Sequence, residues 1–293
     1  MPKIEWPTLA LVLACLCVWA GATTWLVGVS LPLSIILTAL SIALFCSLQH
    51  EIIHGHPFRS RFANEALVFP TLCLVIPFQR FRETHLAHHT DSLLTDPYDD
   101  PESNYLDGGD WETLPGPVKA ILRANNTLLG RLILGPILAQ IAFMRDDWHQ
   151  IRAGDRIVLT GWLWHIPSVS LVLAWVWLAP MPIWAYLIAA YLGLSILKIR
   201  TFLEHQAHAR ARGRTVIIED RGVLAFLFLN NNLHVVHHMH PKVPWYRLRQ
   251  IYHANRARYL EQNDGYLYTS YAQVFRRYFW RAKDPVAHPL WRR

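Results

Sequence analysis

The chain has 293 residues, of which 53% are hydrophobic and only 17% are charged, and its formal net charge is +7. In soluble domains about a quarter of all residues are charged. The lower fraction here argues against an ordinary soluble enzyme and favours a membrane protein. The positive charge is accompanied by no nucleic-acid-binding motif. We interpret it as arginine clusters beside anionic lipid headgroups and expect no nucleic-acid partner.

Two long blocks, Leu9–Gln49 and Ile157–Leu197, contain no Asp, Glu, Lys or Arg. Each is about twice the ~20 residues that a helix needs to cross a bilayer. Proline stands near the middle of each block, at Pro32 and at Pro180 with Pro182, and marks a turn between two spans. We therefore predict four transmembrane helices in two hairpins, at residues 9–29, 33–54, 158–179 and 182–200.

The Lys and Arg residues predict which ends of these helices face the cytoplasm. None lies in the two proline turns, whereas the other ends are flanked by Lys3, Arg59, Arg61, Arg152, Arg156, Lys198 and Arg200. By the positive-inside rule both termini are cytoplasmic, in a bacterial inner membrane or on the equivalent side of another membrane. We expect residues 55–156 and 201–293 to form a cytoplasmic helical cap, and residues 1–293 to be one all-α integral membrane domain.

One segment of the expected cap leaves two interpretations open. The stretch Val118–Trp148 is amphipathic and moderately apolar. It fits either a helix that lies in the membrane interface or a fifth membrane-associated helix.

Histidines cluster at three places beside these spans. The first cluster is HEIIHGH, in which His50 and His54 are four residues apart and share one helical face. The other two clusters are HLAHH and HVVHH, and the second of these follows shortly after three asparagines. Both have the spacing HxxHH. The eight candidate metal ligands are His50, His54, His85, His88, His89, His234, His237 and His238. One zinc ion takes three or four protein ligands, so eight suit two ions; imidazole binds Zn, Cu and Fe alike and does not identify the metal.

The set HxxxH, HxxHH and HxxHH resembles the membrane fatty acid desaturase/hydroxylase superfamily. The first motif follows the second predicted helix, the second lies in the loop beyond that helix, and the third follows the fourth predicted helix. The resemblance covers about residues 33–245. It implies a non-haem centre of two Fe ions that uses O2 as co-substrate and abstracts hydrogen from an unactivated C–H bond. It also implies a ninth ligand at the cytoplasmic end of the fourth helix, where His205 stands.

Several polar residues are candidate partners for the ring N–H groups of these ligands, because metal-bound histidine usually donates its second ring proton. The carboxylates are Glu51, Asp91, Asp96 and Glu204. Asn231 and Asn232 fit the same role, or that of a helix cap. His208 extends a cluster beyond the family spacing, as do His56 and His240. His165, inside the second apolar block, suits a functional or a structural role.

The function that we predict is O2-dependent desaturation of a fatty acyl or lipid-like chain. On the same scaffold the alternative is a hydroxylase or ketolase of an alkyl, sterol or carotenoid-type substrate. The motif HEIIH, with Glu51 as general base, also fits an intramembrane zinc protease, which would leave six clustered histidines unexplained. A non-catalytic metal or lipid binder is the fourth interpretation.

The two electrons that each turnover requires must come from outside the chain. We find no cysteine cluster, no Gly-rich dinucleotide motif and no fused haem domain in the sequence. We therefore expect a separate donor such as a ferredoxin or rubredoxin with its reductase. Arg247, Arg249, Arg256 and Arg258 could bind that donor or lipid headgroups.

Overall fold

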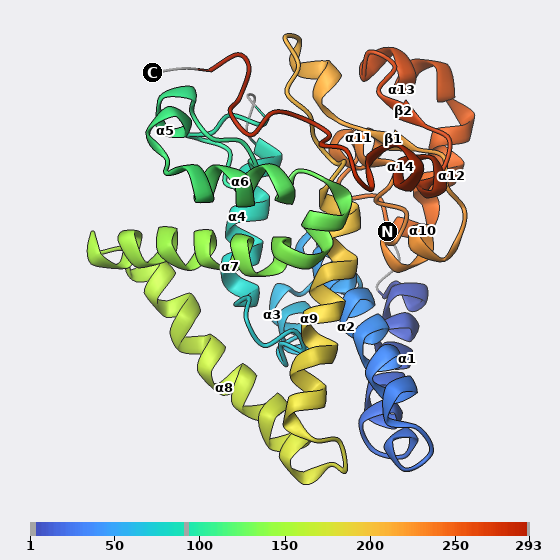
Figure 1. Ribbon diagram of the computed structural model, residues 1–293. Coiled ribbons are helices and arrows are strands. Elements are labelled where there is room, and N and C mark those ends of the chain that lie inside the picture. Colours follow the sequence, from blue (N-terminus) through green and yellow to red (C-terminus); the bar gives the residue numbers. More distant parts are fainter. Residues whose placement is uncertain (1–3, 91–93, 292–293) are drawn as a thin grey trace. The chain divides into compact units, whose positions relative to one another are not determined.

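The computed structural model describes residues 4–90 and 94–291, and these are mostly helical (Figure 1). Their sheet consists of two short parallel strands, β1 (Ile217–Ile218) and β2 (Leu267–Tyr268). The helices are α1 (Trp6–Thr23), η1 (Leu26–Gly28), α2 (Leu31–Ile53), α3 (Arg61–Leu67), α4 (Phe78–Thr90), α5 (Gly108–Thr113), α6 (Gly116–Asn125), α7 (Leu128–Arg152), α8 (Arg156–Leu178), α9 (Ile183–Thr201), η2 (Ala211–Arg214), α10 (Val223–Leu227), α11 (His234–Met239), α12 (Trp245–Ala254), α13 (Arg256–Gln262) and α14 (Tyr271–Tyr278).

The chain folds into two compact units. One comprises Met1–Glu83 and Pro136–Leu197, and we call it the apolar unit because it contains both uncharged blocks. The other comprises Thr84–Gly135 and Lys198–Arg293, and we call it the histidine unit because seven of the nine candidate ligands belong to it. The boundaries between the units fall within α4, α7 and α9.

Five helices in the described residues are long and apolar enough to cross a membrane, which fits an integral membrane protein. Four of them, α1 with η1, α2, α8 and α9, match the four predicted spans to within three residues at each end. The fifth is α7, for which the sequence left two interpretations open. By length and composition alone, α7 qualifies as a span.

Local sequence explains where α2 begins. Ser30 has extended backbone angles and its hydroxyl accepts a hydrogen bond from the Leu33 amide, which caps the helix. Pro32 lies in the first turn of α2, where a missing N–H removes no helical hydrogen bond. The proline therefore lies inside the start of the helix, and the turn is made by the residues before Ser30.

Close approach and a few polar contacts hold the helices of the apolar unit together. A Cβ atom at Gly193 of α9 would lie 2.9 Å from the Ala39 carbonyl oxygen of α2, so glycine is needed there. The Tyr186 hydroxyl of α9 donates to the Leu72 carbonyl (2.8 Å) and accepts from the Trp19 indole of α1 (3.3 Å). These bonds satisfy polar groups that lipid could not satisfy.

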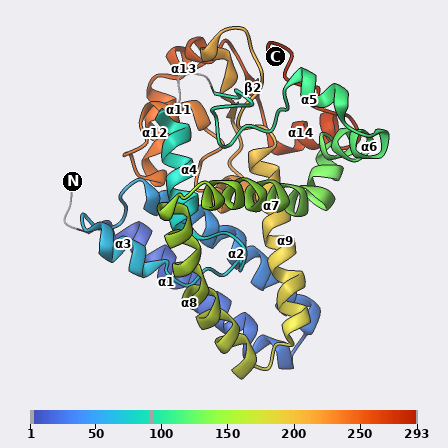
Figure 2. The same ribbon diagram turned by 90° about the vertical axis from the view of Figure 1, so that its left-hand side faces the viewer.

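The part of α7 in the apolar unit runs across the direction of α9 in both views (Figures 1 and 2). A buried ion pair fixes it there. The Arg80 guanidinium, from the first turn of α4, lies 2.8 Å from an oxygen of Asp147 of α7. The Trp162 indole N–H of α8 donates to the same carboxylate at 2.7 Å. One carboxylate thus joins α4, α7 and α8.

Candidate metal centre

Helix α11, which carries the third histidine cluster, follows a sharp reversal of the chain. Leu229 and Asn230 have positive φ values of 51° and 58°, a conformation that asparagine tolerates better than most residues. The Asn232 side chain donates to the Ile218 carbonyl at 2.6 Å, and the Ile218 amide donates to the Asn232 carbonyl at 2.8 Å. This pair of bonds fixes the start of α11 against β1, and His234 and His237 are buried.

Four histidines of the histidine unit form one group, with one ring nitrogen each within 4.8 Å of the others. They are His88, His205, His234 and His238. Nε2 of His205 lies 2.9 Å from Nε2 of His88 and 3.1 Å from that of His234, and Nε2 of His238 lies 3.2 Å from that of His234. Two nitrogens about 2.1 Å from one ion are about 3.0 Å apart at a right angle and about 3.4 Å apart at the tetrahedral angle.

The hydrogen-bond partners of this group show that lone pairs converge. Nδ1 of His88 lies 2.8 Å from Asp100, and a carboxylate only accepts, so Nδ1 carries a proton, and in the neutral form of the ring, which is the form that binds a metal, Nε2 has a lone pair. Nδ1 of His234 lies 3.1 Å from Oδ1 of Asn231, whose amide nitrogen donates to Glu204. Oδ1 of Asn231 is therefore an acceptor, and Nδ1 of His234 carries a proton as well. Both Nε2 atoms face His205, whose single Nε2 could donate to only one of them. A cation between these nitrogens removes the repulsion, and the donor set fits a metal ion.

Three further histidines of the histidine unit lie beside the first group. Nε2 of His237 is 3.1 Å from Nε2 of His89, and the ring centroids of His85 and His89 are 4.6 Å apart. The ring of His89 stacks on that of His238, with centroids 4.3 Å apart. The two sets of imidazoles are therefore immediate neighbours, which is the arrangement that two adjacent ions require.

The remaining two candidate ligands belong to the apolar unit. His50 lies in the last turn of α2, and His54 is the residue that caps its end. Their ring centroids are 5.1 Å apart, as the spacing of four residues predicted, and His50 is buried. The end of α2 thus presents two imidazoles side by side.

Burial keeps most of these imidazoles neutral, which is the form that binds a metal. Burial and the neighbouring histidines hold the pKa values of His205, His234 and His238 well below the ordinary 6.5. Burial, with His85 and His88 nearby, lowers the pKa of His89 to about 3. Burial also opposes the charged form of His88, but the carboxylates of Glu102 and Asp100 outweigh it and raise the pKa of His88 to about 9.

Two carboxylates that the sequence analysis did not single out contact the ligands. Asp100 is the partner of His88, and Oε1 of Glu102 lies 2.8 Å from Nδ1 of His85. Burial raises the pKa of Glu102, but His85 and His88 outweigh it and hold that pKa well below its usual range. Both residues lie in the acidic stretch that follows the HLAHH cluster. The excess of carboxylates just beyond a ligand cluster was the signal that could have identified them.

The candidate partners named from the sequence lie in different surroundings. Glu204 and Asn231 form the chain of hydrogen bonds that ends at His234, and Nδ1 of that ring is 3.6 Å from Glu204. Asn232 bonds to backbone carbonyls, and Asp96 accepts from the Tyr98 amide. Glu51 is buried, with an oxygen 3.8 Å from Nε2 of His56. Asp91 lies outside the described residues.

The histidines without an assigned role have other partners. Nδ1 of His56 is 2.7 Å from Glu5, and Nε2 of His165 donates to the Leu74 carbonyl at 3.0 Å. His208 contacts the Arg210 carbonyl, and His240 contacts the Tyr259 hydroxyl. None of the four belongs to a group of candidate metal ligands in the described residues.

Comparison with known proteins identifies the family. The family model described as fatty acid desaturase matches residues 23–270, most of the chain. The chain belongs to the fatty acid desaturase family. A search of the curated proteins gave no match. Histidine-rich groups in the structure agree with this membership, and the resemblance seen in the sequence is confirmed.

Proposed function

We propose that this desaturase-family protein is an O2-dependent membrane di-iron oxidoreductase that introduces a double bond into a fatty acyl or lipid-like chain. The observation that carries the proposal is the convergence of histidine ring nitrogens in two neighbouring sets. Family membership supports oxidoreductase chemistry on such a substrate.

We assign the ligands from the two sets. One ion would bind His88, His205, His234 and His238, and the other would bind His85, His89 and His237 together with His50 and His54 of the first cluster. The assignment of the last two rests on the HxxxH spacing and on the family pattern. Asp100, Glu102 and Asn231 would hold the ring tautomers that leave Nε2 free for the metal.

Iron is the metal we propose because the reaction requires a redox-active ion, which zinc is not. Bound iron would supply activation of O2 and removal of hydrogen from a methylene group. The residues of this chain bind the ions, hold the imidazoles in one orientation and exclude water, since His88, His234 and His237 are almost fully buried. A separate protein such as a ferredoxin or rubredoxin would supply the electrons.

For the membrane arrangement we propose that α1, α2, α8 and α9 span the bilayer while α7 lies in its cytoplasmic interface. An exposed apolar stripe on α7 supports this: Ile137, Ile141, Met144 and Trp148 recur every three or four residues and are each about half exposed or more. A helix that runs across the spans, with one apolar face uncovered, suits the interface. The termini and the metal site would then face the cytoplasm.

Metal analysis of the purified chain tests the proposal. We expect about two Fe per chain, and we expect His88→Ala and His237→Ala each to abolish O2-dependent turnover and to lower the iron content. His253→Ala is the matched control, because His253 is exposed and belongs to neither set. Stoichiometric zinc with full activity would contradict the proposal.

Mass spectrometry of the product separates desaturation from hydroxylation on the same scaffold. A desaturase removes two hydrogens from the substrate, whereas a hydroxylase adds one oxygen. Lipid profiling of cells with and without the gene identifies the chain that is modified. If Glu51→Gln abolished cleavage of a peptide substrate, the protease interpretation of HEIIH would replace this one.

A further inference from the structure

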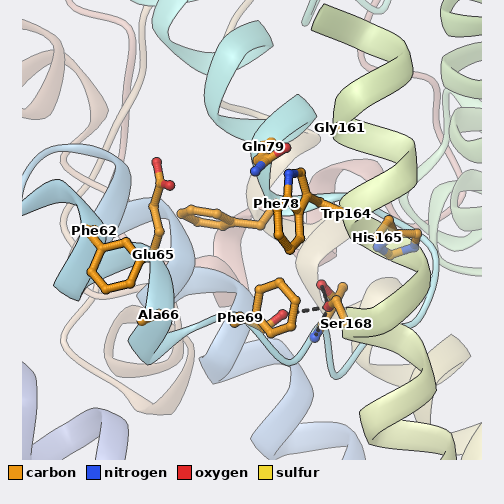
Figure 3. A pocket seen from close by; sticks show the side chains of 11 residues that line it. Phe62, Glu65, Ala66, Phe69, Phe78, Gln79, Gly161, Trp164, His165 and Ser168 are labelled. Carbon is orange, nitrogen blue, oxygen red and sulfur yellow. Dashed lines mark hydrogen bonds between the residues drawn. The ribbon is translucent and has the colours of Figure 1, made fainter.

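A second, mostly apolar site lies in the apolar unit, and none of the candidate metal ligands lines it. It is a cavity of about 470 Å³, within the range of ligand pockets. Its walls come from α3, the segment after α3, the first turn of α4 and α8 (Figure 3). The rings of Phe62, Phe69, Phe78 and Trp164 surround the space. Such a lining suits a hydrocarbon chain.

Several polar groups that line the cavity are paired, whereas Nδ1 of His165 is buried without a hydrogen-bond partner among the described residues. The Ser168 hydroxyl accepts from the Thr71 amide at 2.9 Å, and Nε2 of His165 donates to a backbone carbonyl. The Gln79 side-chain amide also lines the cavity (Figure 3). It could donate to one carbonyl group, such as the ester carbonyl at the start of an acyl chain.

Charge at one wall of the cavity favours an anion. Oε1 of Glu65, a lining residue, lies 2.6 Å from Nε of Arg61 and 3.6 Å from Nε of Arg82. Two guanidinium groups share this one carboxylate, and Glu83, the other carboxylate that attracts Arg82, is paired with Arg80 at 2.5 Å. Nε of Arg82 is buried and makes no hydrogen bond in the part of the chain that the structure describes. A phosphate oxygen would complete the bonding of both arginines.

The surroundings of the cavity point to the membrane as the source of the ligand. α8, which forms one wall, is a candidate membrane span. Phe62 is 83% exposed and Trp164 is 54% exposed, and large aromatic groups at that exposure suit the level of the lipid headgroups. A molecule could therefore pass from the bilayer into the cavity without leaving apolar surroundings.

We propose that this cavity is a binding site for one anionic glycerophospholipid, with an acyl chain among the four aromatic rings and the phosphate on Arg61 and Arg82. No candidate metal ligand is among the lining residues, and the proposal does not depend on the function proposed above. A lipid bound there would hold α3 and the start of α4 against α8. Its occupancy would change with the anionic lipid content of the membrane.

Native mass spectrometry of the full chain, purified in mild detergent and supplied with phosphatidylglycerol or diacylglycerol, tests the proposal. We expect one phosphatidylglycerol to be retained per chain and diacylglycerol to be retained at least tenfold less. Ala66→Trp fills the cavity, and the double change Arg61→Gln with Arg82→Gln removes the phosphate contacts; each should lower phosphatidylglycerol retention at least tenfold. The matched controls Ile166→Trp, on the exposed face of α8, and Arg156→Gln should behave as the unaltered chain does.

A crosslinking measurement makes the result independent of how well the variants fold. Phosphatidylglycerol that carries a diazirine on its acyl chain should label peptides containing residues 62–69 and 161–168 of the unaltered protein. Labelling elsewhere, equal retention of diacylglycerol, or unchanged retention by a folded Ala66→Trp variant would overturn the proposal. Recovery of a free fatty acid in place of the phospholipid would also overturn it.

Discussion

At the scale of single residues, the proton on each imidazole decides which nitrogen can bind a metal. His88 and His234 each have a fixed acceptor at Nδ1, Asp100 and Asn231 respectively, so the neutral form of each ring turns an unprotonated Nε2 toward His205. The acceptors differ in charge. Asp100 is a buried carboxylate, and its contact with His88 raises the basicity of the ring as well as orienting it.

Replacing Asp100 tests this orientation. Asp100→Asn keeps the size of the side chain but removes the charge, and its NH2 group would face either Nδ1 of His88 or the Thr95 amide, both of which donate to Asp100. We expect metal affinity to fall by roughly 10–100-fold, the usual effect of losing such a partner. Competition with a calibrated chelator measures the affinity. Asp99→Asn is the matched control, because Asp99 is the adjacent residue and is exposed. Equal affinities in the two variants would contradict the role of Asp100.

At the scale of the element, α4 and α11 each divide their HxxHH cluster between the two sets. In α4, His85 and His89 join one set and His88 joins the other. Helix α11 gives two histidines, His234 and His238, to the set of His88, and one, His237, to the set of His89. Residues four apart on a helix lie above one another, so each helix can give two ligands to one ion and one to its neighbour.

The ion pair between Arg80 and Asp147 is the main polar contact that positions α7 in the apolar unit. Asp147 is 1% exposed and accepts from both Arg80 and Trp162. Asp147→Asn would leave the buried Arg80 guanidinium with Glu83 as its one remaining counterion, so we expect the free energy of unfolding to fall by no more than the roughly 3–5 kcal/mol that a fully unpaired buried charge costs. Thermal unfolding in detergent measures the loss. The exposed neighbour gives the control: Asp146→Asn should have little effect.

Spin labels along α7 test whether it lies in the interface. If it does, labels at Ile137→Cys, Ile141→Cys and Trp148→Cys should all lie at a similar, shallow depth, because the helix axis is parallel to the membrane plane. A label at Ile166→Cys near the middle of α8 should lie much deeper. Depth is measured from the relative effects of oxygen and a nickel complex on label relaxation. A deep label at Ile141 with shallow labels on both sides would show that α7 spans the bilayer.

At the scale of the whole molecule, metal ions would tie together segments that are distant in sequence. In the histidine unit, one group draws His88 from α4, His205 from the stretch after α9, and two histidines from α11. A metal that binds the folded state but not the unfolded chain adds its binding free energy to stability.

Removing the metal should therefore loosen the histidine unit selectively. After chelation of the loaded protein we expect faster amide hydrogen exchange in residues 84–90 and 230–239, and a lower unfolding temperature. Exchange in α1 should be unchanged, because its contacts are with other helices of the apolar unit. Adding back iron should restore the original exchange rates. Uniform acceleration across both units would mean that chelation acts in another way.

The sequence by itself determined the features that depend on local periodicity. The absence of charge over two long blocks placed four helices to within three residues, and the spacing of three and four residues put each histidine cluster on one helical face. It also pointed to the family, because the combination of three clusters is specific. These signals are readable because they repeat over one or two helical turns.

Only the tertiary structure decided which residues meet across long separations. The division of each HxxHH cluster, the partners Asp100 and Glu102, and the ion pair of Arg80 with Asp147 have no local signature. The same holds for the cavity beside α8, whose walls come from segments about 100 residues apart. Such contacts depend on the path of irregular segments, which short-range spacing does not report, and on packing that is settled only when the whole chain has folded.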